Sequence, residues 1–312
     1  MNAIVRIAVA GGGDSPEREV SLRSQAAVLT ALERAGINVV AYDPSEQSLD
    51  WLVNARIDCV FNVLHGPGGE DGRLQGALDL LGIPYTGCDV RASALAMDKV
   101  VSKLLFRHAE LPTPDWVELG VNDAVPTDPN LGWPVFVKPA SQGSSVGMSR
   151  VDEPADLAAA VDAARAVESR VLIESFVAGS EYTVTVLGRD VLPSIRIETP
   201  RVFYDYEAKY NADTTRYICP ALTGAAEAEL ATLALAAFDA LGCHGWGRVD
   251  FIADAAGAMQ VIEVNTVPGM TDHSLVPMAA AARGMDFTEL CLAILATAPI
   301  ALPVPARANH GG

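Results

Sequence analysis

Two short segments near the C-terminal end constrain the fold most, because each has the pattern of a strand and together they predict a hairpin. They are residues 247–252 and 261–265, and turn-forming residues 254–257 lie between them. Since side chains alternate across a strand, each segment has one apolar face, which needs a core, and one polar face. The polar faces present four side chains: Arg248, Asp250, Glu263 and Asn265.

These four side chains form a candidate metal and phosphate site. Two carboxylates and an amide oxygen suit a hard cation such as Mg²⁺, which keeps coordination positions for water and substrate phosphate. The adjacent arginine can hold phosphate or developing negative charge. The alternative is a hairpin whose polar face is merely solvated, since short motifs have many false positives.

Composition limits the partners of the chain. It has 312 residues, of which 50% are hydrophobic, and can therefore form two or three domains with substantial cores. The net charge of −17 is spread along the sequence, which argues against attraction to nucleic acid or to an anionic membrane. An anionic substrate must therefore meet a local basic site.

The terminal regions predict neither export nor a membrane span. Residues 1–6 run directly into a strand-like segment, and prolines interrupt the apolar stretch 291–306. The cysteines are scattered and odd in number, without a CxxC pair, which favours buried, reduced thiols. They are Cys59, Cys88, Cys219, Cys243 and Cys291. We expect a soluble, cytoplasmic protein.

Strand-like and helix-like segments alternate up to about residue 100, which predicts a parallel α/β layer with functional loops at the C-terminal ends of its strands. The expected strands are residues 4–10, 38–42 and 59–64, and the expected helices are 17–35, 73–81 and 93–108. Later segments indicate α+β modules. Their expected strands are 135–138, 170–176, 181–187 and 191–197, and their expected helices are 154–166 and 225–241. The irregular residues 199–220 are typical of a lid.

A glycine- and serine-rich loop follows the strand that carries Lys138. Its backbone N–H groups and hydroxyls can close over phosphates, with the lysine as a point charge, or the loop can be an ordinary surface turn. The residues after Ser145 look extended rather than helical, which excludes a hydrolase nucleophile elbow. A Walker A loop is absent from the sequence because no glycine precedes a lysine.

The strand-like residues 170–177 can form the wall of an adenosine pocket. Phe176 and Val177 would pack on a base, while Glu174 and Glu181 would accept hydrogen bonds from amino or ribose donors. The alternative is an ordinary amphipathic strand.

Further candidates point to an amino-acid substrate. Glu17 in the first helical turn can hold an ammonium, although the helix dipole alone favours an acid there. His65 beside a glycine-rich loop can contact substrate or simply fill a strand end. Residues 265–275 offer hydroxyls and backbone donors for a carboxylate. Lys209 and Tyr210 can belong to a closing lid or to a solvated loop.

Taken in order, seven motifs closely resemble those of the D-alanine:D-alanine ligase family. They are residues 16–22, 65–72, 97–99, 138–147, 204–210, 245–250 and 263–275, within a resemblance that extends from about residue 4 to 298. The family belongs to the ATP-grasp enzymes, so the resemblance implies an N-terminal parallel-sheet (α/β) domain followed by an ATP-grasp pair of α+β domains. The implied domains are residues 1–100, 101–182 and 183–312, with a lid loop at about 200–218.

The resemblance also implies the reaction. ATP would phosphorylate the carboxylate of one D-alanine, and the amine of a second would displace phosphate to give D-alanyl-D-alanine for peptidoglycan. The implied cofactors are two Mg²⁺ ions, which Mn²⁺ can replace, and a K⁺ requirement stays open. A homodimer is implied as well.

Residue roles follow from the same resemblance. The implied metal ligands are Asp250, Glu263 and Asn265. The implied nucleotide contacts are Lys99, Lys138, Ser144, Glu174, Phe176, Val177, Glu181 and Lys209. The implied substrate contacts are Glu17, His65, Arg248, Ser274 and Leu275. Arg248 and the backbone N–H near Gly269 would stabilise the oxyanion, and Ser144 with Tyr210 would link the lid to Glu17.

Two alternatives remain at this point. Another ATP-grasp carboxylate-amine ligase, or one that joins D-alanine to D-lactate, would share the nucleotide half but differ in its acceptor; Tyr210 favours an amide product. A nucleotide-binding regulatory module that has lost turnover would have no need for Arg248 and Tyr210.

Overall fold

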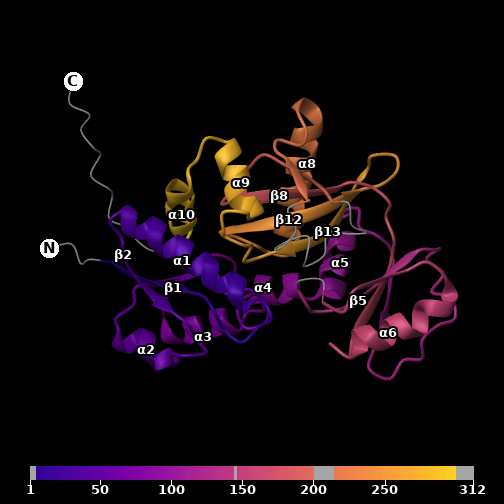
Figure 1. Cartoon of the computed structure of the whole chain (residues 1–312), viewed down its shortest axis with the longest axis horizontal. Coiled ribbons are helices and arrows are strands. Elements are labelled where there is room, and N and C mark those ends of the chain that lie inside the picture. The colour runs from indigo at the N-terminus through magenta and orange to yellow at the C-terminus, as the bar shows by residue number, and fades with distance from the viewer. Residues whose placement is uncertain (1–4, 144–145, 200–213, 300–312) are drawn as a thin grey trace.

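The computed structural model describes residues 5–143, 146–199 and 214–299 and contains three β-sheets (Figure 1). In Figure 1 the N-terminal sheet lies on the left, the second sheet lies with helix α6 on the right, and the third lies in the upper centre. None of the helices in these ranges has the length and apolar character needed to cross a membrane.

The N-terminal sheet confirms the expected parallel layer. Its strand order is β2-β1-β3, and both pairings are parallel. On β1, Ile7 and Val9 join the core formed with helices α1 and α10, whereas Ala8 and Ala10 face α2 and α3. The elements are β1 (Arg6–Ala10), α1 (Arg18–Arg34), β2 (Asn38–Tyr42), α2 (Leu49–Asn54), β3 (Cys59–Asn62) and α3 (Arg73–Leu81).

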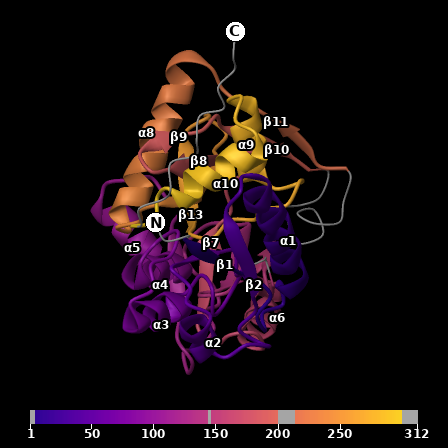
Figure 2. The ribbon, with the colours of Figure 1, turned by 90° about the vertical axis from the view of Figure 1, so that its left-hand side faces the viewer.

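The C-terminal end of the chain completes this layer. Helix α10 (Phe287–Leu295) packs beside α1, as Figure 2 shows, so the core of the N-terminal sheet includes residues from both ends of the sequence. Such long-range packing leaves no signal in local periodicity.

The single helix expected over residues 93–108 is wrong, because the structure has two helices, α4 (Val90–Met97) and α5 (Lys99–His108). Asp98 separates them with an extended backbone, φ −87° and ψ 103°, and its carboxylate accepts hydrogen bonds from the N–H groups of Val100 and Val101. An aspartate that caps the following helix in this way satisfies donors that a continuous helix would have paired internally.

The second sheet is antiparallel, in the order β4-β7-β5-β6, and buries one face under helix α6. The short strand β4 was not among the strands expected from the sequence. The elements are β4 (Trp116–Leu119), β5 (Val135–Pro139), β6 (Ser149–Val151), α6 (Leu157–Arg165) and β7 (Val171–Ser175), with a 3₁₀ turn at Pro154–Asp156.

The third sheet has the order β11-β10-β8-β12-β13, with β9 paired to β8. The strand expected over residues 191–197 is in fact two strands with Pro193 between them, since proline has no N–H for a ladder. One face packs on α4, α5 and α8. The elements are β8 (Glu181–Leu187), β9 (Asp190–Val191), β10 (Ile195–Glu198), β11 (Arg216–Ile218), α8 (Gly224–Ala240), β12 (Trp246–Ala253), β13 (Met259–Asn265) and α9 (Leu275–Ala282).

The turn between β7 and β8 provides a test of this packing. A Cβ added at Gly179 would lie 1.6 Å from the carbonyl oxygen of Ala253 on β12. We expect Gly179→Ala to destabilise the protein by about 1–3 kcal/mol, measured as a lower Tm by calorimetry. The control is Gly76→Ala in α3, where the added Cβ has ordinary contact, 3.6 Å from Val90. An equal Tm for the two variants would contradict the packing of this turn against β12.

Candidate active site

A cavity of about 320 Å³ lies where loops of the first sheet meet the polar faces of the other two. All of the candidate site residues that the structure describes line it. They are Glu17, His65, Lys99, Lys138, Glu174, Phe176, Val177, Glu181, Arg248, Asp250, Glu263, Asn265, Gly269, Ser274 and Leu275. Ser144, Lys209, Tyr210 and residues 200–213 of the expected lid lie outside the described residues, whereas strand β11 occupies Arg216–Ile218, in a stretch that was expected to be irregular.

The expected hairpin forms in the register that brings the polar side chains together. Antiparallel pairing of β12 with β13 sets Arg248 opposite Asn265 and Asp250 opposite Glu263. The alternating Val249 and Val264 are buried in the core on the opposite face. Hydrophobic burial of one face therefore directs the carboxylates and the amide into the cavity.

Asp250 lies at the centre of a hydrogen-bonded group. Arg248 donates to both of its carboxylate oxygens, from Nε at 2.8 Å and from Nη2 at 2.7 Å. Asn265 Nδ2 donates to Oδ2 at 2.9 Å, and Thr183 Oγ1 on β8 donates to Oδ1 at 2.6 Å. The guanidinium is thus held at the cavity wall by an acid of the same strand.

The donor set of this hairpin fits a magnesium ion. Within residues 5–143, 146–199 and 214–299 no cluster of three or more His, Cys, Asp or Glu side chains has metal-binding geometry. The hairpin instead offers two carboxylates and one amide in one cavity. This set matches Mg²⁺, which binds few protein ligands and takes the rest from water and substrate phosphate.

Lys99 connects the hairpin to the glycine-rich loop. Its Nζ lies 3.7 Å from Glu263 Oε2 and donates to the carbonyl oxygen of Gln142 at 2.7 Å. Its backbone N–H donates to Ala140 O at 2.9 Å. Lys99, the first residue of α5, therefore fixes the position of the glycine-rich loop and places its side-chain nitrogen between that loop and the hairpin.

The second sheet contributes an aromatic and charged wall. Phe136 lies directly across from Glu174 on the neighbouring strand, and its ring packs 5.7 Å from that of Phe176. Lys138 on the same face donates to Glu174 at 2.5 Å. Burial by itself would raise the pKa of the Glu174 carboxyl, but Lys138 and Lys103 outweigh burial and lower the pKa to about 2.

Glu17 occupies the junction between two loops. It is 7% exposed, and its Oε2 lies 3.0 Å from where a Cβ on Gly66 would be and 3.3 Å from where one on Gly143 would be. Ser15 Oγ accepts from the Glu17 backbone N–H and donates to the carbonyl oxygen of His65. Because Gly66 and Gly143 have no side chains, the Glu17 carboxylate has room to lie between them at the cavity.

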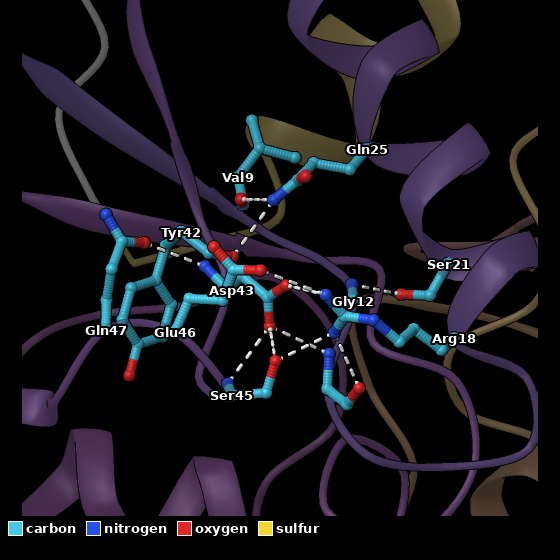
Figure 3. Close-up of polar contacts among 11 residues, drawn as sticks. Val9, Gly12, Arg18, Ser21, Gln25, Tyr42, Asp43, Ser45, Glu46 and Gln47 are labelled. Atoms are coloured by element: carbon cyan, nitrogen blue, oxygen red, sulfur yellow. Dashed lines mark hydrogen bonds and ion pairs between the residues drawn. The ribbon is translucent and has the colours of Figure 1, made fainter.

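A polar clasp formed by Arg18, Asp43 and Ser45 holds the turn at Gly12 and Gly13 (Figure 3). Arg18, the residue after Glu17, pairs with Asp43 at 2.8 Å, and its Nη1 donates to Gly13 O and Ser45 Oγ. Asp43 also accepts from the backbone N–H groups of Gly13 and Ser45. Gly12 and Gly13 have positive φ, 83° and 73°, which favours glycine in this turn.

His65 joins the first sheet to the loop after β13. Its Nε2 lies 3.2 Å from Ser24 Oγ, and its Nδ1 lies 3.0 Å from the carbonyl oxygen of Val267. Ser24 Oγ in turn accepts from the backbone N–H of Met270. Glu70 lies 3.7 Å from Nδ1, and burial raises the pKa of its carboxyl. His65 therefore positions the segment that contains Gly269.

The start of α9 faces the same cavity. Ser274 is the N-cap residue, and its Oγ accepts a hydrogen bond from the Thr271 N–H at 2.9 Å. A Cβ on Gly269 would lie only 2.8 Å from that oxygen. The helix N-terminus and the bare backbone at Gly269 give this end of the cavity hydrogen-bond donors for an anion.

Several residues that line the cavity or lie directly behind it were given no role from the sequence. Phe136 could have been found, because strand alternation places it on the face of Lys138. Lys103 lies one helical turn after Lys99, which is also a usable signal. Glu70 and Arg23 line the cavity: Glu70 lies within the motif 65–72 but was given no role, and nothing in the local sequence marks Arg23.

The sequence and the fold match known proteins over nearly the whole chain. The family model "D-ala D-ala ligase C-terminus" matches residues 105–296 and "D-ala D-ala ligase N-terminus" matches residues 45–88. The D-alanine–D-alanine ligase B of Chromobacterium violaceum is 51% identical over 94% of this chain and 97% of its own.

Solved structures agree with this relationship. The D-alanine–D-alanine ligase of Bacillus anthracis complexed with ATP has a TM-score of 0.83 at 32% identity and covers 94% of this chain and 97% of that one. The VanG D-Ala:D-Ser ligase of Enterococcus faecalis has a TM-score of 0.80 at 31% identity, with 94% and 99% covered. The three sheets and the cavity between them therefore define an ATP-grasp ligase fold. The chain belongs to the D-alanine–D-alanine ligase family.

The clasp predicts a pH-dependent difference in stability. Burial would raise the pKa of Asp43, but Arg18, Gly13 and Ser45 outweigh it and lower the pKa from 3.8 to about 2. Ionised Asp43 therefore stabilises the fold above about pH 4, and this contribution is lost as the pH falls toward 2. We expect the Tm difference between wild type and Asp43→Asn to be constant above pH 4 and to shrink below it.

The control is Asp239→Asn, which removes an exposed pair with Arg189 and should change the Tm little at any pH. A difference between wild type and Asp43→Asn that stays the same down to pH 2 would show that Asp43 is not held ionised by the clasp.

Proposed function

We propose that this chain joins two D-alanines to D-alanyl-D-alanine with ATP as the second substrate, for peptidoglycan synthesis. The observation that supports this most is that one cavity is lined by all of these groups: the polar face of the β12–β13 hairpin, Lys138 on the second sheet, Glu17 and the N-terminus of α9. One end offers an acid for an ammonium group, and the other offers cations for phosphates. Family membership agrees with the proposal.

ATP would lie along the second sheet. Phe136 and Phe176 with Val177 would pack on the base, while Glu174 and Glu181 accept hydrogen bonds from amino or ribose groups. Lys99 and Lys138 would bind phosphates, together with Ser144 and Lys209 of the segments outside the described residues. The ATP complex of the Bacillus anthracis ligase supports nucleotide binding by this fold.

Both amino acids would bind between the first sheet and α9. Glu17 would hold the ammonium of the first D-alanine, with His65 near its carboxylate. The N-terminus of α9, with Ser274 and Leu275, would hold the carboxylate of the second. Ser144 and Tyr210 would link the lid to Glu17.

The proposed reaction has two steps. A carboxylate oxygen of the first D-alanine attacks the γ-phosphorus, the bond to the β-phosphate breaks, and ADP leaves. The amine of the second D-alanine then attacks the acyl carbon, loses a proton, and phosphate departs from the tetrahedral intermediate. Asp250, Glu263 and Asn265 would hold two Mg²⁺ ions, or Mn²⁺, which supply charge neutralisation at the phosphates. Arg248 and the backbone N–H near Gly269 would stabilise the oxyanion.

The proposal includes the organisation of the chain. Residues 1–100 would form a substrate domain, residues 101–182 the central ATP-grasp domain, and residues 183–312 the C-terminal ATP-grasp domain with a lid at about 200–218. The active protein would be a cytoplasmic homodimer, and a K⁺ requirement can be tested in the same assay.

The decisive experiment mixes purified protein with Mg-ATP and D-alanine and measures ADP, phosphate and dipeptide. We expect phosphate release that depends on D-alanine and a dipeptide formed in equal amount. D-Serine and D-lactate are tested as acceptors, because a neighbouring structure is a D-Ala:D-Ser ligase. Preferred use of either acceptor would assign the runner-up function, and no D-alanine-dependent phosphate release would contradict a ligase.

Arg248→Ala tests the oxyanion role. Loss of one preorganised donor should lower kcat by about 10²–10³-fold while the KM for ATP changes much less. The control is Arg189→Ala, which removes an exposed ion pair between the turn that joins β8 to β9 and helix α8. An unchanged kcat for Arg248→Ala would rule out its role at the reacting carbon.

A further inference from the structure

Glu174 in the cavity wall is shared by two lysines. Lys103 Nζ lies 2.5 Å from Oε1, and Lys138 Nζ lies 2.5 Å from Oε2. All three side chains are nearly inaccessible, with exposed fractions of 1% for Lys103, 8% for Lys138 and 4% for Glu174. Two amino groups thus share one carboxylate in the protein interior; burial lowers the pKa of Lys103, while the adjacent Glu174 acts in the opposite direction.

The two lysines differ in how firmly they are held. Lys103 also donates to Thr113 Oγ1 at 2.7 Å, and Thr113 donates to the Val261 carbonyl oxygen on β13 at 2.8 Å. Both ammonium groups lie near an aromatic ring, Lys103 at 5.2 Å from the Trp116 centroid and Lys138 at 5.4 Å from the Phe136 centroid, so the hydrogen bond to Thr113 is what distinguishes Lys103. Lys103 does not line the cavity, whereas Lys138 does. Lys103 is thus anchored behind the wall, and Lys138 faces the space that a nucleotide would fill.

This difference explains why Glu174 has a second lysine partner, Lys103. A buried carboxylate that loses its partner is strongly destabilised. If Glu174 had Lys138 as its sole counter-charge, Lys138 could turn to a phosphate only by leaving the carboxylate unpaired. With Lys103 in place, the carboxylate keeps one cation after Lys138 has moved, and that cation is itself held by Thr113.

We propose that Lys103 is a positioning residue for nucleotide binding, because it keeps Glu174 paired and so lets Lys138 exchange that carboxylate for a phosphate of ATP. The inference rests on the proposed function insofar as the cavity takes ATP. Glu174 stays ionised and in place to accept a hydrogen bond from the amino group of the base.

The test is Lys103→Met, which removes the charge and keeps most of the side-chain volume. We expect the Kd for Mg-ADP, measured by calorimetry, and the KM for ATP to rise by about tenfold or more, since Lys138 becomes the sole partner of Glu174. The KM for D-alanine should change less than about twofold, because Lys103 lies behind the wall of the nucleotide half.

Rescue distinguishes this role from a general structural one. In Lys103→Met/Glu174→Gln the buried carboxylate is gone and Lys138 is released, so the Kd for Mg-ADP should return to within about twofold of Glu174→Gln alone. The double variant also removes both charges together, which protects folding. A matched control is Arg107→Met, which removes the cation stacked 4.1 Å from the same Trp116 ring and should leave the Kd unchanged.

The outcomes are separable. Mg-ADP binding by Lys103→Met that equals wild type would overturn the inference, and so would a double variant that binds Mg-ADP more than about twofold more weakly than Glu174→Gln alone. Wild-type protein that binds Mg-ADP without D-alanine-dependent phosphate release would contradict the ligase function instead, while the comparison of Kd values would still decide the role of Lys103.

Discussion

The register between β12 and β13 is the constraint on which the site depends. A slip of one residue would turn Asp250 toward the core and Val249 toward the cavity. Burial of Val249 and Val264 opposes such a slip, and pairing with β8 fixes Thr183 against Asp250 from the other side. The position of the polar groups is therefore set by apolar packing on the opposite face of the same strands.

Short-range sequence patterns predicted individual strands and helices, but not the contacts between distant segments. The parallel sheet, the hairpin and helices α1, α3, α6 and α8 follow from alternation and periodicity within each segment. Asp98 shows the limit, because its apolar surroundings continue a helical pattern while its carboxylate caps the next helix and pairs with Arg170. The packing of α10 on α1 could not be predicted from local patterns, since the two helices are at opposite ends of the chain.

The candidate site shows the same division. Sequence motifs and the family resemblance named residues that the structure brings to one cavity, while their roles remain proposals. Contacts between segments were not accessible from the sequence: the pairing of Arg18 with Asp43, the link from His65 to Val267, and the sharing of Glu174 with Lys103. Each joins positions whose separation no short pattern encodes.

Charge pairing explains how an acidic chain can bind a polyphosphate. In the described cavity each main cation has a carboxylate partner: Lys99 with Glu263, Lys138 with Glu174, and Arg248 with Asp250. Such pairs hold the cations in place in a protein of net charge −17. Under the proposed function, Mg-ATP brings both kinds of charge at once: divalent ions would take Asp250 and Glu263, while Lys99 and Lys138 turn to phosphates. Glu174 takes no metal ion and would keep Lys103 as its partner, so no buried carboxylate is left unpaired when the nucleotide binds.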